Sequence, residues 1–180
     1  MTASRRIFLT GMPASGKTTL GQAVARLRPG WILVDVDSEI EARRGLTVPQ
    51  IFAADGEAAF RALENEVMED ICRREGNIIV CTGGGTPCAD GRMEMMRRAG
   101  TVVLLDAPVE ILARRVRQQP GRRPLLEGCD DLDARLEALR KDRNVYYNKA
   151  HYVFDSSLLD TAGDIERSAA SFVERYIDKP

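Results

Sequence analysis

A glycine-bearing turn between an apolar run and an amphipathic segment constrains this chain more than any other feature. Residues 11–18 read GMPASGKT and fit the pattern G-x-x-x-x-G-K-[ST], with an apolar run before them and helix-forming sequence after them. Glycines let backbone N–H groups curl round phosphate oxygens, and the next helix adds the positive end of its dipole. A chance glycine turn is the alternative, but the full pattern in this context predicts a strand, a phosphate loop and a helix that bind ATP or GTP.

Two side chains of this loop have predicted roles. Lys17 is expected to reach the β- and γ-phosphates, and the Thr18 hydroxyl is expected to ligate Mg²⁺. Residues 148–151 begin like the guanine-reading pattern N-K-x-D but lack its aspartate, so they are predicted to end a helix instead. The residues predicted to bind the nucleotide in this region are Gly11, Met12, Pro13, Ala14, Ser15, Gly16, Lys17, Thr18 and Thr19.

Short apolar runs alternate with segments of helical periodicity along the chain. Most runs are apolar at every position, as in strands that are covered on both faces. Strand and helix in turn, five times, predict an α/β fold with a five-stranded parallel sheet flanked by helices. The predicted strands are residues 7–10, 31–35, 77–81, 101–105 and 152–154.

Five helices are predicted between and after these strands. The third begins near Pro108 with Asp106 as a candidate N-cap, and the last two cover about 131–149 and 164–177. The apolar faces of the first two helices carry Leu20, Ala23, Val24 and Leu27, and Phe60, Leu63, Val67 and Ile71.

Two segments interrupt the alternation. Residues 37–74 hold helices but no strand, so they are predicted to form a flap beside the sheet. Residues 119–130, QPGRRPLLEGCD, lie between two helices and have the composition of a mobile cover, or lid. The whole chain, 1–180, is predicted to be a single domain with these two additions.

Composition excludes several classes of function. The net charge of -1 gives no field that would hold nucleic acid or a membrane surface. The four cysteines form no C-x-x-C pair and the single His151 lies far from them, so neither a zinc site nor a disulfide framework is expected. No apolar run approaches the length of about 18 residues that a membrane span needs. A cytoplasmic protein is predicted.

An acidic pair follows the second predicted strand. Asp35 and Asp37 come at its carboxyl end, where ligands of open α/β sheets bind. Residues two apart in an extended chain point the same way, so both carboxylates can face one crevice. One could hold magnesium through water, and the other could accept the proton of a substrate hydroxyl. The alternative is a helix N-cap, since Asp37 and Ser38 open a helix.

Two arginines and a glycine triplet complete the set of candidates. Arg143 steps with Leu136, Leu139 and Tyr146 along an apolar stripe, where a guanidinium needs an anionic ligand or a core carboxylate. Arg61 lies at the margin of its helix's apolar face, and by position alone a solvated side chain is favoured. Residues 83–85 are all glycine after a predicted strand, which indicates close approach of a ligand to the backbone rather than a flexible turn.

Together these residues resemble the shikimate kinase family, along nearly the whole chain. The phosphate loop is shared with very many proteins, but the combination of the other motifs is far more specific. Those motifs are the D-x-D of Asp35 and Asp37, GEAAFRALE around Arg61, TGGG at 82–85, RRPLL at 122–126 and KDRNVYYNKAHYVFD around Arg143.

The resemblance implies the P-loop, nucleoside-monophosphate-kinase-like fold and transfer of the γ-phosphoryl of MgATP to the 3-hydroxyl of shikimate. It implies that Asp37 holds the acceptor hydroxyls near the attacking oxygen, that Asp35 holds Mg²⁺ indirectly, and that Thr18 ligates it directly. It further implies substrate-binding roles for Arg61, Gly83, Gly84, Gly85 and Arg143, a nucleotide contact for Arg115, and a catalytic lid arginine at Arg123.

Two departures from the family pattern and two alternatives stand beside this resemblance. The family's loop often has glycine where this chain has Ala14 after Pro13, which predicts a stiffer loop, and Arg123 is preferred over Arg122 because it directly precedes Pro124. The alternatives are another small-molecule kinase, for gluconate or a nucleoside monophosphate, and a regulatory module that binds ATP without turnover. A monomer is expected.

Overall fold

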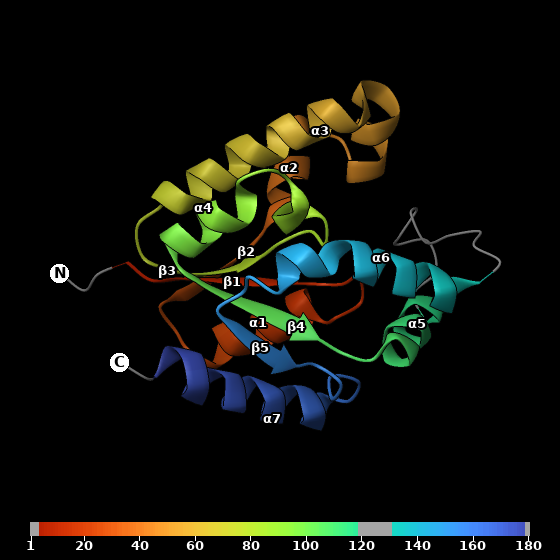
Figure 1. The fold of residues 1–180 in the computed structure, drawn as a ribbon. Helices are drawn as coiled ribbons and strands as arrows, with labels where there is room; N and C mark the ends of the chain where they lie inside the picture. Colours follow the sequence, from red (N-terminus) through yellow and green to blue (C-terminus); the bar gives the residue numbers. More distant parts are fainter. Residues whose placement is uncertain (1–3, 119–130, 179–180) are drawn as a thin grey trace.

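The computed structural model describes residues 4–118 and 131–178 as five parallel strands with helices on both faces (Figure 1). The strand order is β2-β3-β1-β4-β5, which confirms the predicted fold class. The strands are β1 (Arg6–Gly11), β2 (Trp31–Asp35), β3 (Asn77–Cys81), β4 (Thr101–Asp106) and β5 (Tyr152–Asp155). Three of them extend beyond their apolar runs, because backbone pairing such as Asp106 with Asp155 needs no apolar side chain.

The helices fall into two layers and an end group. α1 (Lys17–Leu27) and α7 (Ala162–Phe172) cover one face of the sheet, and the π-helical turn η3 (Val173–Ile177) continues α7. The other face is covered by α2 (Val36–Arg44), α3 (Val48–Arg73) and α4 (Arg92–Ala99). The end group follows β4 and consists of α5 (Val109–Arg117) and α6 (Leu132–Tyr147), while the short 3₁₀ turn η1 (Thr86–Cys88) follows β3.

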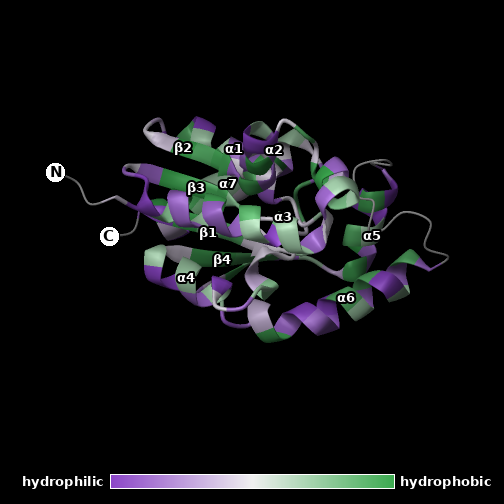
Figure 2. Ribbon diagram, turned by 90° about the horizontal axis from the view of Figure 1, so that it is seen from above, coloured by the Kyte–Doolittle hydropathy of each residue, from purple (hydrophilic) through white to green (hydrophobic). Residues whose placement is uncertain are grey.

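The central strands hold the core together because their side chains alternate between the two layers. Leu9, Ile79 and Val103 pack toward α1 and α7, while their neighbours Phe8 and Val80 pack toward α3 and α4. Figure 2 shows the apolar residues gathered on these strands, with polar residues toward the outside of the helices. A strand that is buried on both faces is therefore apolar throughout, as predicted.

Local signals explain where the helices of the predicted flap begin. Thr47 and Gln50 form a capping box at the start of α3, and each side chain accepts a hydrogen bond from the other residue's backbone N–H. Gly56, with φ 79°, interrupts the helical backbone within α3. The segment contains helices and no strand, as the sequence predicted.

No helix in the described residues has both the length and the apolarity to cross a membrane.

Three local predictions were wrong. Asp106 does not cap α5, because it is the last residue of β4 and its carboxylate accepts a hydrogen bond from Arg140. The N-cap of α2, which was the alternative role for the acidic pair, is Asp35 rather than Asp37, and Asp37 lies inside the first turn. Leu27 is 43% exposed at the end of α1, where the helix has passed the edge of its apolar contact.

Candidate active site

The phosphate loop leaves the carboxyl end of β1 with three residues in left-handed backbone conformations. These are Gly11 (φ 141°), Ala14 (φ 64°) and Gly16 (φ 89°). A Cβ atom on Gly11 would lie only 2.3 Å from the carbonyl oxygen of Leu105, so only glycine fits beside β4. The loop therefore turns sharply enough for the N-terminus of α1 to point into the space above the sheet.

Lys17 occupies the interior of this loop. Its Nζ donates to the carbonyl oxygens of Gly11 and Met12, both at 3.0 Å, and to Ser15 Oγ at 3.4 Å. The ammonium group is thus held by the loop itself. All of these contacts join residues within six positions of each other, so the motif's spacing alone determines them.

A hydroxyl and a carboxylate meet beside the loop. Thr18 Oγ1 donates to Asp35 Oδ2 at 2.9 Å, while Asp35 Oδ1 accepts from the backbone N–H of Ser38 at 3.4 Å. The described residues contain no group of three or more His, Cys, Asp or Glu side chains that could hold a metal. Mg²⁺ usually takes only one or two protein ligands and completes its shell with water and phosphate oxygens. The Thr18–Asp35 pair fits that pattern.

Asp37 lies in the first turn of α2, half-buried, with its carboxylate toward the triple glycine. A Cβ atom on Gly83 would be 3.3 Å from Asp37 Oδ1. Burial, together with the negative charges of Asp35 and Glu64, raises the pKa of Asp37 to about 6, although Lys17 opposes this rise. The carboxylate is therefore ionised at neutral pH, but it is a stronger base than an exposed aspartate.

Arg61 and Arg143 converge on the triple glycine from α3 and α6. A Cβ atom on Gly84 would lie 2.8 Å from Arg143 Nη1, and one on Gly85 would lie 3.1 Å from Arg61 Nη2 and 3.6 Å from Arg143 Nη2. The missing side chains let both guanidinium groups approach the backbone. Two residues that are 82 positions apart thus form one cationic subsite.

The two arginines differ in their protein partners. Arg61 forms ion pairs with Glu64 at 2.9 Å and with Glu57 at 3.3 Å. Arg143 forms no ion pair within the described residues, and its Nη1 is buried without a hydrogen-bond partner there. Of the two alternatives left open by its position in the sequence, an anionic ligand is favoured over a core carboxylate.

Tyr147 fixes the triple glycine from α6. Its hydroxyl donates to the carbonyl oxygen of Gly84 at 2.7 Å. Burial raises the pKa of Tyr147 to about 12, with the Arg143 charge opposing, so the phenol keeps its proton. The predicted apolar stripe on this helix named Tyr146, but Tyr147 is the buried tyrosine.

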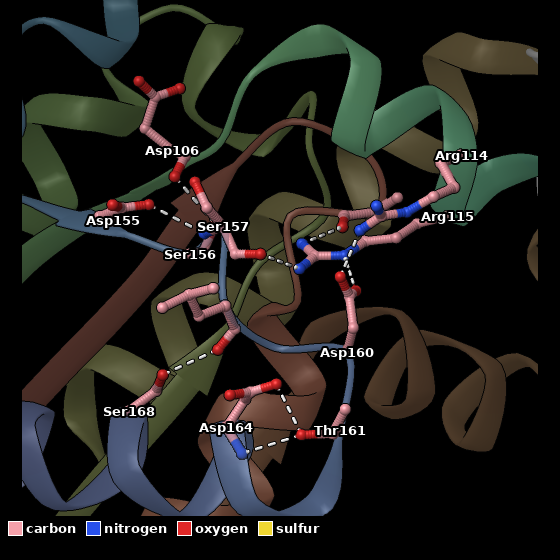
Figure 3. A network of polar contacts seen from close by, with 12 residues as sticks. Asp106, Arg114, Arg115, Asp155, Ser156, Ser157, Asp160, Thr161, Asp164 and Ser168 are labelled. Carbon is pink, nitrogen blue, oxygen red and sulfur yellow. Dashed lines mark hydrogen bonds and ion pairs between the residues drawn. The ribbon is translucent and has the colours of Figure 1, made fainter.

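A cavity of about 460 Å³ lies on the other side of the loop. Arg115 Nε donates to Asp160 Oδ1 at 2.7 Å, its Nη2 donates to the Ser157 carbonyl oxygen at 3.0 Å, and its Nη1 donates to the Ala14 carbonyl oxygen at 3.4 Å (Figure 3). Arg115 therefore ties the segment after β5 to the phosphate loop. The residues that line the cavity are Ala14, Gly16, Thr19, Arg114, Arg115, Gln118, Leu159 and Asp160.

The structure brings the predicted site residues together at the carboxyl edge of the sheet, with one exception. Arg123, its alternative Arg122 and the predicted lid lie outside the described residues. Sequence reasoning missed four contributors. Two of them could have been found from helical spacing, because Glu64 lies one turn after Arg61 and Tyr147 lies one turn after Arg143. The other two, Thr86 and Asp160, gave no such signal, because their partners are distant in the sequence.

Comparisons with known proteins agree on one family. The family model described as shikimate kinase matches residues 13–176. A shikimate kinase from Bacteroides thetaiotaomicron is 40% identical over 94% of this chain and 97% of its own length. One from Nitrosomonas europaea is also 40% identical, over 96% of this chain and 77% of its own.

Solved structures agree with the sequence matches. A crystal structure of the Bacteroides thetaiotaomicron shikimate kinase superposes with a TM-score of 0.88 at 37% identity, and covers 94% of this chain and 97% of that one. An Acinetobacter baumannii shikimate kinase in complex with shikimate gives 0.81 at 30% identity, over 94% and 91%. A gluconokinase from Sinorhizobium meliloti gives 0.51 at 17% identity, over 95% and 92%, which shows a shared fold only.

Proposed function

This chain belongs to the shikimate kinase family, and on that premise we propose that it transfers the γ-phosphoryl group of ATP to the 3-hydroxyl of shikimate. The products are ADP and shikimate 3-phosphate, an intermediate of aromatic amino acid biosynthesis. One observation carries the proposal: two guanidinium groups converge on the triple glycine, and Asp37 lies against the same segment. A substrate with a carboxylate at one end and a hydroxyl at the other matches this arrangement.

Arg61 and Arg143 bind the substrate carboxylate. A planar guanidinium suits a planar carboxylate because it can donate two parallel hydrogen bonds. Arg143 Nη1 supports this role, because it is buried without a hydrogen-bond partner in the described part of the chain, and such a donor is costly unless a ligand satisfies it. The backbone of residues 83–85 contacts the substrate, and a side chain at Gly84 or Gly85 would crowd the two arginines.

Asp37 orients the acceptor hydroxyl and receives its proton. Its pKa of about 6 is high enough to make it a stronger base than an ordinary aspartate and low enough to leave it mostly ionised at neutral pH. The triple glycine, where the shikimate hydroxyl would bind, lies close to the phosphate loop, where ATP would bind. A Cβ atom on Gly84 would lie 3.2 Å from the Gly11 carbonyl oxygen and 3.4 Å from Pro13 Cδ. The acceptor subsite therefore adjoins the phosphate loop, as in-line transfer requires.

The phosphate loop holds the nucleotide. Backbone N–H groups of residues 11–19 and the Lys17 ammonium neutralise the β- and γ-phosphates, and Arg115 borders the cavity that takes the nucleoside. Thr18 would ligate Mg²⁺ directly, and Asp35 through water. When bound, the ion would supply positive charge to the phosphate groups. We assign the remaining charge stabilisation to Arg123 of the lid, residues 119–130, by the family pattern.

Three wider properties complete the proposal. The chain acts as one domain in which residues 37–74 form the substrate flap, and it works as a monomer with no nucleic-acid or membrane partner. We place it in the cytoplasm. The unpaired state of the three described cysteines supports that location, because disulfides are uncommon there.

The deciding experiment is ADP release from MgATP with shikimate, gluconate or a set of nucleoside monophosphates as acceptor. We expect shikimate alone to stimulate turnover strongly. Stimulation by another acceptor would keep the kinase and overturn the specificity. ATP binding without turnover for any acceptor would favour a regulatory module instead.

A further inference from the structure

A third arginine lies behind the carboxylate-binding pair. Arg92, at the start of α4, is 3% exposed, and its Nη1 lies 3.6 Å from Glu64 Oε2. That distance is too long for a hydrogen bond, and both Nε and Nη1 of Arg92 are buried without hydrogen-bond partners in the described residues. Burial lowers the pKa of Arg92, although the charge of Glu64 opposes this. A buried cation with unsatisfied donors is costly and requires an explanation.

Glu64 is the link between Arg92 and the substrate subsite. Its side chain is only 1% exposed, and its Oε1 accepts a hydrogen bond from Thr86 Oγ1 at 2.6 Å. Its Oε2 accepts from Arg61 Nη1 at 2.9 Å and faces Arg92 from the other side. One carboxylate oxygen is therefore shared between an arginine of the site and an arginine outside it.

We infer that Arg92 is a positioning residue, which acts through Glu64 to keep Arg61 aimed at the substrate carboxylate. This rests on the proposed function. Arg61 already donates to Glu64 through Nη1 and to Glu57 through Nη2, so without Arg92 it alone would balance the buried charge of Glu64 and would be held closer to these carboxylates. Arg92 takes part of that charge, so the Nη2 side of Arg61 stays at Gly85, where Arg143 also arrives.

The charge count supports the same conclusion. Two guanidinium groups, of Arg61 and Arg92, contact the buried carboxylate of Glu64, while Glu57 lies on the exposed side and contacts Arg61. Arg143 adds a positive charge at the triple glycine, and its buried Nη1 has no hydrogen-bond partner in the described residues, so this end of the subsite is complementary to an anion. A pair that served stability alone would instead be expected to close to hydrogen-bond distance and to satisfy the arginine's donors.

The test compares Arg92→Met and Arg92→Lys with the wild-type protein. For Arg92→Met we expect the KM for shikimate to rise about tenfold, with kcat and the KM for ATP changed less than about twofold. Arg92→Lys keeps a charge and should recover part of the loss, and it serves as the second variant if the methionine protein does not fold. Arg74→Met is the matched control, because it breaks an arginine–glutamate pair of the same helical layer, with Glu39 at 2.6 Å. It should leave both KM values unchanged.

A double-variant experiment tests the route through Glu64. In a Glu64→Gln background, the additional effect of Arg92→Met should fall to less than about twofold, because the shared carboxylate is gone. An undiminished tenfold effect would mean that Arg92 acts on the substrate directly, and an unchanged shikimate KM in folded Arg92→Met and Arg92→Lys would leave it a purely structural role. Either result overturns the inference while wild-type turnover stands. A wild-type protein that shikimate does not stimulate overturns the proposed function first.

Discussion

The nucleotide half of the site and the acceptor half differ in how far apart in the sequence their parts lie. The nucleotide half is concentrated in residues 11–19, where Lys17 donates hydrogen bonds to Gly11, Met12 and Ser15 of the same loop. The acceptor half collects Asp37, Arg61, residues 83–85 and Arg143 from four separate segments. Backbone geometry forms the first half, whereas side chains that converge on the triple glycine from distant segments form the second.

This difference predicts how each half fails. A change in the loop should damage the reaction for any acceptor, because the loop holds the group that is transferred. A change among the acceptor residues should act on shikimate and leave ATP binding intact. Each variant below tests whether changes in the two halves have these separate effects.

The largest effect is expected for Lys17→Met. The substitution removes the ammonium group from the loop interior, and kcat should fall about 10³-fold because preorganised charge at the phosphoryl group is lost. Turnover is measured with saturating shikimate and ATP, and thermal unfolding checks the fold. Near-normal activity in a folded protein would refute the assignment of this loop.

Asp37→Asn should have the next largest effect and should act in opposite directions on turnover and stability. Loss of the base should lower kcat about 10²-fold. The pKa of Asp37 in the folded protein is about 6 against an ordinary 3.8, so the folded state binds this proton more tightly than the unfolded state. The ionised carboxylate therefore destabilises the fold above pH 6, and the penalty disappears as the pH falls toward 4.

The amide variant should thus be more stable than the wild type at pH 7, by about 1–2 kcal/mol once the partial exposure of the side chain is allowed for. The difference should vanish near pH 4. Thermal unfolding at both pH values measures it, and wild-type kcat/KM should decline below about pH 6. Normal kinetics for Asp37→Asn would show that the carboxylate is not the base. Equal stability of the two proteins at pH 7 would show that the ionised carboxylate does not destabilise the fold.

Asp37 also illustrates where sequence reasoning succeeds and where it stops. That two carboxylates follow a buried strand, and so lie at the ligand-binding edge, could be predicted from chain order. Which of them caps α2 could not, because the choice depends on how the strand passes into the helix; Asp35 is the cap. The prediction that Asp106 caps α5 was wrong for a similar reason, because its partner Arg140 lies 34 residues away on another helix.

The same limit separates the two halves of the site. The pattern G-x-x-x-x-G-K-[ST] contains the nucleotide loop almost completely, because its contacts are local. Arg143 could be singled out as a cation on an apolar stripe, but its meeting with Arg61 required the triple glycine to lie between α3 and α6. Glu64, in turn, gains its importance from Thr86 and Arg92, which are 22 and 28 positions away.

Arg143→Lys should weaken the acceptor half selectively. A lysine keeps the charge but cannot donate two parallel hydrogen bonds, so the KM for shikimate should rise about 10- to 100-fold, with the KM for ATP within about twofold. Arg140→Lys is the matched control on the same helix, because Arg140 pairs with Asp106 at 2.6 Å rather than facing the triple glycine. Equal effects of the two variants, or an unchanged shikimate KM, would return Arg143 to a structural role.

Tyr147→Phe tests whether the backbone of the triple glycine needs its anchor. The Gly84 carbonyl oxygen would lose its donor, and a hydrogen bond of about 1 kcal/mol corresponds to a rise of roughly fivefold in the KM for shikimate. The neighbouring Tyr146→Phe provides the control and should have no such effect. If both tyrosine variants bind shikimate as the wild type does, the glycine segment holds its position without α6.

The smallest effect should come from Ala14→Gly, and it tests the claim that backbone geometry alone forms the nucleotide half. Ala14 is the one non-glycine residue with positive φ in the described chain, at 64°. A left-handed alanine costs about 1–2 kcal/mol, while glycine loses about 0.5–1 kcal/mol more conformational entropy on folding. The net effect should be a gain in stability of up to about 1 kcal/mol.

The contact from Arg115 ends on the Ala14 carbonyl oxygen, which glycine retains, so the KM for ATP should change less than about twofold. Ala25→Gly, within α1, should instead destabilise the protein by about 1 kcal/mol. If thermal unfolding showed the same loss for both variants, Ala14 would not be strained, and its left-handed conformation would have to be stabilised by contacts beyond the loop.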